Sequence, residues 1–133
     1  MKKVIGVAGL VIIISLVSVL MFTNDFSNIK KVEYQKYNHS NGTFGEVIVI
    51  DDNDRIIQIT KIFNKGKHQN IQYKKANHES FKLTLTYEDK TTEIIRIWGN
   101  MGRDFDLLES DTREGVYKLK DKKSRGKLFG ILN

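Results

Sequence analysis

The feature that most constrains this chain is an uncharged stretch close to its N-terminus. Residues 4–22 read VIGVAGLVIIISLVSVLMF and contain no Asp, Glu, Lys or Arg. A helix rises ~1.5 Å per residue, so a helix of this length would roughly match the ~30 Å hydrocarbon core of a bilayer. The stretch therefore predicts a transmembrane helix. Its anchoring side chains include Val4, Leu10, Ile13, Leu16 and Phe22.

Two lysines, Lys2 and Lys3, precede this stretch and predict its orientation. Basic residues are enriched on the cytoplasmic side of membrane spans, so we expect the N-terminus in the cytoplasm and the rest of the chain outside. The predicted organisation is a cytoplasmic tip (1–3), an anchor (4–22), a polar stalk (23–28) and one extracytoplasmic domain (29–133). This predicts a single-pass protein of the cell membrane.

A cleaved secretory signal is the alternative interpretation of the same stretch. Such signals combine an apolar region of ~7–15 residues with small side chains at the cleavage site. Here the apolar run is longer, and it ends in the large side chains of Leu20, Met21 and Phe22. This pattern favours an uncleaved anchor, whereas cleavage would make the protein a secreted one.

The chain of 133 residues has no cysteine. Disulfides, thiolate metal sites, a cysteine nucleophile and a lipid-modified cysteine are therefore all excluded. With 40% hydrophobic and 29% charged residues, the composition is that of a globular protein. An exported domain without disulfides points to a bacterial cell surface more than to a eukaryotic secretory route.

The net charge of +6 is mild. With Lys2 and Lys3 set aside, the 22 basic residues fall to 20 against 16 acidic ones, which leaves +4 for the rest of the chain. Such an excess suits anionic neighbours such as lipid headgroups or acidic wall polymers, and a solvated lysine-rich face is the simpler interpretation. The charges are too dispersed to predict a nucleic-acid partner.

Hydrophobic periodicity predicts the first half of the domain. Residues 29–37 fit a strand, Asn41-Gly42 fits a hairpin turn, and the near-continuous apolar run 46–50 fits a strand in the interior of a sheet. Apolar residues at three- and four-residue spacing predict a helix over 54–64, capped by Asp51 or Asp52. Residues 67–77 show no periodicity and predict a loop.

The second half is dominated by a predicted hairpin over residues 81–98. Apolar and polar side chains alternate strictly in FKLTLTY, as in a half-buried strand. Short strands over 105–108 and 116–119 follow, then a small amphipathic helix over 121–132. The predicted fold class is α+β: an N-terminal transmembrane helix, then a small antiparallel sheet of about five or six strands with two helices packed on it.

Over residues 46–132 the chain resembles small extracytoplasmic proteins of Gram-positive bacteria, often lipoproteins of unknown function. The shared features are the helix after an apolar strand, the hairpin FKLTLTY to IIRIW, and a Tyr-x-Leu segment (Tyr117-Lys118-Leu119) before a tail with Leu128 and Leu132. The chain lacks the lipoprotein cysteine, which favours a membrane span as its anchor. The resemblance implies a fold and carries no catalytic residues.

The candidate metal ligands are few. His39, His68 and His78 all fall in predicted loops, where solvated histidines are the simplest interpretation, although His68 and His78 could converge with Glu79. The acidic run 51–54 fails the calcium-loop spacing, because hydrophobic residues occupy the fifth and sixth positions. We therefore predict no metal and no cofactor.

One candidate binding surface combines aromatic and basic side chains. If they share a sheet face, these residues would suit a peptide, a glycan or an acidic polymer. Its members are Tyr87, Arg96, Trp98, Arg103 and Arg113. The alternative is that Trp98 caps the edge of the core.

Taken together, these patterns predict a non-enzymatic binding or accessory module at a bacterial cell surface. Its expected partners are the bilayer, through the N-terminal helix, and a protein or an anionic wall polymer. Two alternatives remain open. One is a small metal-dependent hydrolase that uses loop histidines and acids, and the other is an immunity or inhibitor protein for a secreted partner.

Overall fold

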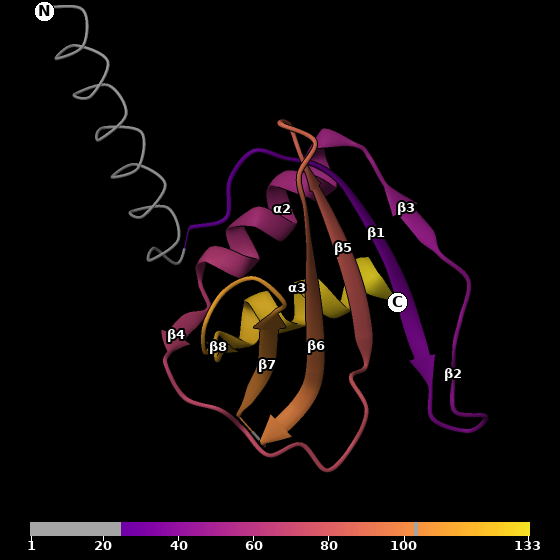
Figure 1. Cartoon of the computed structure of the whole chain (residues 1–133), viewed down its shortest axis with the longest axis vertical. Helices are drawn as coiled ribbons and strands as arrows, with labels where there is room; N and C mark the ends of the chain where they lie inside the picture. The colour runs from indigo at the N-terminus through magenta and orange to yellow at the C-terminus, as the bar shows by residue number, and fades with distance from the viewer. Residues whose placement is uncertain (1–24, 103) are drawn as a thin grey trace, which may run out of the picture.

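The computed structural model describes residues 25–102 and 104–133, which form an antiparallel sheet and two helices (Figure 1). The eight described strands follow the order β2-β1-β5-β6-β7-β8-β4, and β3 also pairs with β1. The strands are β1 (Ile29–Asn38), β2 (Thr43–Phe44), β3 (Ile48–Ile50), β4 (Lys67–Gln69), β5 (Phe81–Tyr87), β6 (Thr92–Gly102), β7 (Phe105–Ser110) and β8 (Val116–Leu119). The helices are α2 (Asn53–Asn64) and α3 (Lys122–Leu132).

The hairpin of β5 and β6 forms the centre of the sheet, as the strict alternation of its side chains predicts. Leu83 lies opposite Ile95 and Phe81 lies opposite Ile97, and all four side chains are buried on the inner face. The positions between them face the other side, because successive residues of a strand point to opposite faces. The predicted hairpin is therefore confirmed, and it supplies the inner wall of the core.

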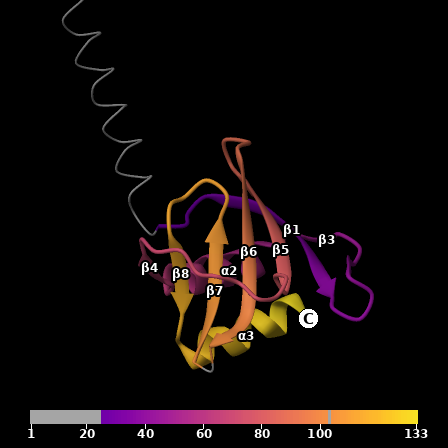
Figure 2. The ribbon, with the colours of Figure 1, turned by 60° about the horizontal axis from the view of Figure 1, so that its bottom comes forward.

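Both helices cover the inner face of the sheet (Figures 1 and 2). The buried stripe of α2 recurs at three- and four-residue spacing and packs in the same core as the strands. It consists of Ile56, Ile59, Ile62 and Phe63. Each helix begins at an aspartate: the side chain of Asp52 accepts the N–H of Arg55 at 3.1 Å, and that of Asp121 accepts the N–H of Ser124 at 3.1 Å.

Residues 25–28, the described part of the segment predicted as a polar stalk, contribute Phe26 to this core. Phe26 is 1% exposed, and its ring lies 5.3 Å from that of Phe63 and 5.5 Å from that of Tyr117. The side-chain amide of Asn64 makes two hydrogen bonds to the backbone of Phe26. Its oxygen accepts the N–H of Phe26 at 2.6 Å, and its nitrogen donates to the carbonyl of Phe26 at 2.9 Å. Residues 25–28 therefore belong to the folded domain.

The outer face of the sheet carries a second, smaller apolar cluster. Trp98, Leu107 and Val116 are buried there, with Tyr73, Met101 and Phe105 packed against them. The segment between β4 and β5 crosses in front of β8, β7 and β6 (Figure 2) and provides part of this cover. Over β1 and β5, by contrast, outer positions such as Glu33 and Thr84 are only half-buried.

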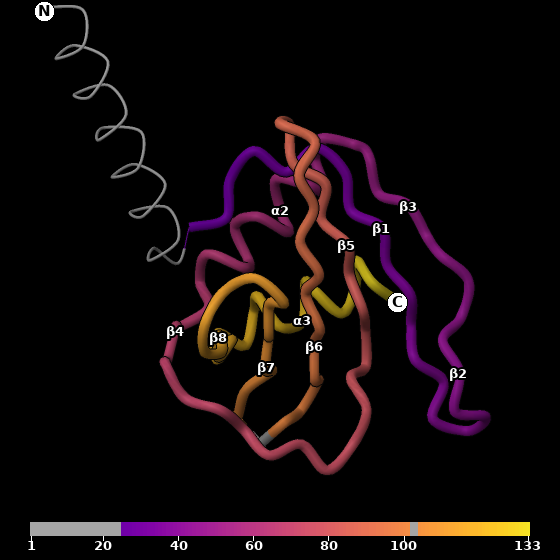
Figure 3. Tube along the Cα trace, viewed as in Figure 1, coloured from indigo at the N-terminus to yellow at the C-terminus, as the bar shows by residue number. Residues whose placement is uncertain are grey.

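The two edges of the sheet are built differently. Along one edge, β2 pairs with the end of β1 and β3 pairs with its middle, so that the two short strands form one interrupted edge strand (Figure 3). Between them, the N–H of Gly45 donates to the carbonyl of Lys36 at 2.8 Å. At the other edge β4 pairs with β8. Helix α2 connects β3 to β4 and so crosses the inner face from edge to edge.

The fold class predicted from the sequence is wrong. The sheet has eight described strands instead of five or six, because β2 adds a two-residue pairing at the end of β1 and β4 forms through pairing with the distant β8. No helix within residues 25–102 and 104–133 is long and apolar enough to cross a membrane. The predicted transmembrane helix over residues 4–22 lies outside the described residues and gains no support.

Two local predictions also need correction. The apolar run 46–50 does not lie in the interior of the sheet, because β3 occupies an edge and only Ile50 of this run is buried. Residues 67–77 are not wholly a loop, because Lys67–Gln69 forms β4 on β8. Both errors concern short segments whose structure depends on a partner far away in the sequence.

Candidate functional site: an exposed apolar edge strand

Three consecutive apolar side chains are exposed along the β3 edge, which we define as residues 46–52. Val47 is 53% exposed, Ile48 41% and Val49 49%. Single exposed apolar residues are common, but a contiguous group is typical of interaction sites. This group is therefore the strongest candidate site in the described part of the chain.

The backbone of β3 has a strand neighbour on one side only. Its residues Ile48, Val49 and Ile50 lie opposite Tyr34, Glu33 and Val32 of β1, and the described residues place no strand on the other side. An edge of this kind presents backbone N–H and C=O groups on which a further strand can form. The β3 edge thus combines apolar side chains with hydrogen-bonding capacity.

The surroundings of the β3 edge are acidic. Glu46 precedes the apolar residues, Asp51 and Asp52 follow them, and Asp54 lies in the first turn of α2; all four are exposed. Among these four, the described ion pairs involve only Asp52, whose carboxylate lies 2.6 Å from Nε of Arg55. The hydrogen bonds from Arg55 hold the pKa of Asp52 below its ordinary value. At neutral pH the site is therefore negatively charged at both ends.

This charge pattern disfavours pairing between the β3 edges of two copies. In an antiparallel arrangement that places Ile48 opposite Val49, Glu46 of one copy would face Asp51 of the other. A shift by one residue would place Glu46 against Asp52. Like charges directly opposite each other on neighbouring strands are destabilising. The edge is thus better matched to a segment of basic character.

Two members of the predicted aromatic-basic surface instead lie in a buried polar network around Glu93, which is 4% exposed. The hydroxyl of Tyr87 donates to Glu93 at 2.5 Å, Nε of Arg113 donates at 2.8 Å, and Ser110 donates through its hydroxyl. Burial and the hydrogen bond to Glu93 raise the pKa of Tyr87. Burial lowers the pKa of Arg113, but pairing with Glu93 outweighs it and raises that pKa.

The network has a structural role that sequence spacing does not reveal. Arg113 also donates from Nη1 to the carbonyl of Asp25 at 3.0 Å, and its guanidinium lies 3.9 Å from the ring centre of Phe26. The network therefore ties the start of the described chain to the β5–β6 hairpin and to the turn after β7. Loss of one partner would leave the buried carboxylate of Glu93 incompletely satisfied, which is destabilising.

Two further members, Arg96 and Trp98, form hydrogen bonds with the segment between β4 and β5. Arg96 donates to the buried carboxylate of Glu79 at 2.7 Å, and the indole N–H of Trp98 donates to the carbonyl of Asn77 at 3.1 Å. Burial raises the pKa of Glu79, but hydrogen bonds from Arg96 and from His78 outweigh it and lower that pKa. Arg103 lies outside the described residues. The four described members thus fall into two separate groups.

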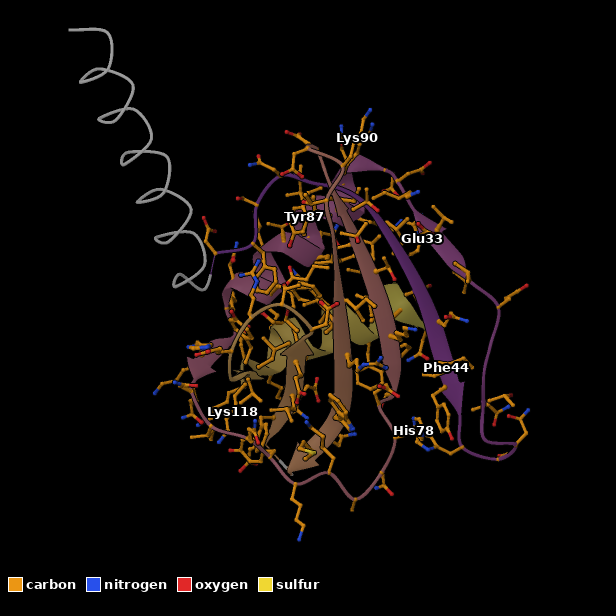
Figure 4. All side chains as sticks on the ribbon, in the orientation of Figure 1. Glu33, Phe44, His78, Tyr87, Lys90 and Lys118 are labelled. Carbon is orange, nitrogen blue, oxygen red and sulfur yellow. The ribbon has the colours of Figure 1, made fainter. Side chains whose placement is uncertain are left out.

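The three histidines lie in two places: two of them pack on the ring of Tyr37 and the third lies in β4. The ring of His78 stacks on Tyr37 with centres 4.2 Å apart, and His39 packs against the same ring at 4.9 Å. Figure 4 shows His78 beside Phe44 at this end of β1. His68 lies in β4, with Nε2 2.7 Å from the carbonyl oxygen of Glu114. Residues 25–102 and 104–133 contain no group of three His, Asp or Glu side chains placed to hold a metal ion.

A polar cleft of about 640 Å³ lies between the segment after β4 and the turn between β7 and β8. Its lining includes Lys75 and Arg113, the two cations that could attract an anionic ligand. Lys75 is paired with Glu109, however, and Arg113 with Glu93. Because both charges are already compensated, the cleft is a weaker candidate than the β3 edge.

The sequence contains a signal for the β3 edge, but an ambiguous one. A short apolar run fits an interior strand and an exposed one equally well, because periodicity is not visible over five residues. The acidic residues that flank the run at 46 and 51–52 are the informative feature, since charges are a common protection of edge strands. No protein-family model, curated protein or solved structure matches the chain.

Proposed function

We propose that the protein is a non-enzymatic binding module that accepts an extended segment of a protein partner along the β3 edge. The observation that carries this proposal is the exposed apolar strand with one open side. Strand addition to a sheet edge is a common mode of peptide recognition, in which backbone hydrogen bonds give affinity and alternate side chains give specificity.

The site also defines the chemistry of the partner. The segment should carry apolar side chains at alternate positions, to cover Val47 and Val49, and it should have Lys or Arg at both ends, opposite Glu46 and Asp51. Charge complementarity of this kind mainly sets specificity and the association rate. The expected ligand is therefore a basic, β-prone segment of another protein.

A designed peptide tests the proposal directly. The probe alternates Val and Thr over five positions and carries two lysines at each end; a second peptide has glutamates in their place. We expect the lysine-flanked peptide to bind the full-length chain and to protect the amides of residues 46–52 from hydrogen exchange. Methylation of alternate peptide nitrogens should abolish binding, because it removes the backbone hydrogen bonds that a new strand needs.

Two exposed residues give a matched pair of variants. Val49 is 49% exposed on β3 and Ile57 is 50% exposed on α2, so neither substitution by Asp disturbs the core. We expect Val49→Asp to weaken peptide binding by about three- to tenfold, since full burial of a valine contributes about 1.5–3 kcal/mol and Val49 is still 49% exposed. Ile57→Asp should bind like the wild type. Equal binding by both variants, or equal binding of both peptides, would contradict the proposal.

A further inference from the structure

A second surface gathers the lysines of four elements at the opposite edge of the sheet. It lies where α2 ends, β4 begins, β8 ends and α3 begins. We call it the basic edge, and it consists of Lys61, Lys65, Lys67, Lys118, Lys120, Lys122 and Lys123. The sequence shows these residues as two dispersed groups, and the fold brings them together.

The contacts between the elements establish this clustering. Lys67 of β4 and Lys118 of β8 are direct cross-strand partners. Nζ of Lys65 lies 3.6 Å from the carboxylate of Asp121, the residue that caps α3. Lys61, in the last turn of α2, precedes the C-cap residue Lys65 by four positions, which places the two on the same side of the helix end. Figure 4 shows Lys118 on this side of the molecule.

Little negative charge offsets this group. Within the described residues, Asp121 is the one carboxylate within 4 Å of any of the seven ammonium groups. Lys118 lies instead over the rings of Tyr73 and Phe105, at 4.9 and 4.8 Å from their centres. Like charges held close together repel one another, and a cross-strand lysine pair is destabilising. A counter-charge from outside the chain would relieve this repulsion.

The place where the described chain begins indicates which kind of anionic partner would supply this counter-charge. Phe26, next to the first described residue, packs on Phe63 and Tyr117, beside the basic edge. Figures 1 and 2 both show the described chain starting on the side of β4. In the sequence, residues 4–22 carry no charged side chain and end three positions before Asp25. The described chain thus begins beside a lysine cluster, and the residues that precede it in the sequence are uncharged and apolar. These two chemical characters match the two parts of a lipid surface, phosphates and acyl chains.

We propose that the basic edge docks on the anionic headgroups of a lipid surface. The proposal is independent of the β3 edge and of its partner. Lysines near an anionic membrane surface contribute about 1 kcal/mol each at low salt, and the effect falls off within a Debye length. Docking in this way would direct the basic edge toward the lipid and the β3 edge away from it.

Vesicle flotation of the full-length chain tests this docking. The probes are vesicles of phosphatidylcholine alone and vesicles with added phosphatidylglycerol. Any binding through the uncharged N-terminal segment is common to both, so the measured quantity is the excess partitioning onto the anionic vesicles. We expect this excess to decrease as salt is added. We also expect acetylation of the seven lysines to decrease selectively on the anionic vesicles.

Two triple variants with equal charge change serve as test and control, and all six side chains are exposed. The test variant combines Lys120→Gln, Lys122→Gln and Lys123→Gln. The control variant combines Lys30→Gln, Lys36→Gln and Lys90→Gln, on β1 and the β5–β6 turn. We expect each substitution in the test variant to reduce the excess partitioning about fivefold, and each substitution in the control variant to reduce it far less.

Three results would overturn the docking. The first is an equal loss in both triple variants, which would reflect net charge alone. The second is the absence of any excess on anionic vesicles. The third concerns a soluble polyphosphate. If it protects the seven lysines from acetylation as strongly as the anionic vesicles do, the surface binds a free polyanion instead of a lipid surface. The thermal unfolding midpoint of the control variant should match the wild type, and that of the test variant should be equal or higher, because the substitutions remove mutually repelling charges. The peptide assay on the β3 edge should be unaffected.

Discussion

The two edges of the sheet differ in almost every property that affects pairing. The β3 edge is apolar, acidic at its ends and open on one side. The β4 edge carries Lys67, His68 and Gln69, is surrounded by lysines, and lies beside the docked N-terminal segment. Charged side chains protect sheet edges in many proteins, but they differ in sign at these two edges. This difference is the basis for proposing a different partner for each edge.

Helix α2 connects these opposite edges and contributes to their charges. Asp52 and Asp54 at its start and Lys61 and Lys65 at its end are favourable for the helix itself, because the helix N-terminus is partially positive and the C-terminus partially negative. This local effect does not extend to Lys118, Lys120 or Lys122, which lie on other elements. The charge asymmetry of the molecule is thus larger than helix stability requires.

The largest expected effect is at the core beside the β4 edge. Replacement of Phe26 by Ala should lower the free energy of unfolding by about 3–5 kcal/mol, because it removes a fully buried ring from the contacts with Phe63 and Tyr117. Chemical denaturation of the full-length chain measures this loss. A loss below about 1 kcal/mol would mean that residues 25–28 are a stalk after all.

A smaller effect should follow from loss of the clamp on the backbone of Phe26. Asn64→Ala removes both hydrogen bonds to this backbone and leaves its polar groups without partners, at a cost of about 1–3 kcal/mol. The same denaturation experiment applies. Asn53→Ala, at the start of the same helix, is a matched control and should change stability less.

The stability contributed by Glu79, in the segment between β4 and β5 that covers part of the outer face, should depend on pH. The pKa of Glu79 in the folded state lies below its ordinary value of 4.5, so its stabilising contribution is complete above about pH 4.5 and is lost as the pH falls through the folded pKa. Glu79→Gln should therefore be less stable than wild type at pH 7, and this difference should shrink toward pH 3. A difference that is the same at both pH values would refute the assignment.

The smallest effect on stability is expected at the β3 edge. Val47→Thr and Val49→Thr should each change the free energy of unfolding by less than about 0.5 kcal/mol, because both side chains are already exposed. The same substitutions should weaken binding of the lysine-flanked peptide. If they instead destabilise the fold as much as Asn64→Ala does, the exposed residues serve the fold and the comparison between the edges fails.

The sequence predicts the parts of this fold that local patterns determine. The alternation over 81–87 and the spacing of Ile56, Ile59 and Ile62 were sufficient for the central hairpin and for α2, because each pattern repeats several times. Strands β2 and β4 were not predictable, since β2 has only two residues and β4 depends on pairing with the distant β8. The strand over 46–50 was predicted, but its edge position was not, because that position depends on which strands pair. For the same reason Arg113 was expected on a surface, while the fold places it against the buried carboxylate of Glu93.

The clamp of Asn64 on Phe26 also has a mechanical consequence. A pulling force applied at the start of the described chain is met by Asp25, whose carbonyl accepts a hydrogen bond from Arg113, and by Phe26. Phe26 is held by two hydrogen bonds to Asn64 and packs against Phe63 and Tyr117. The load therefore passes into α2 and β8 before it reaches Ile29 and the first bonds between β1 and β5. Without the clamp, tension would peel β1 from the sheet one hydrogen bond at a time. With it, several elements share the load at once, and the domain resists traction from that end.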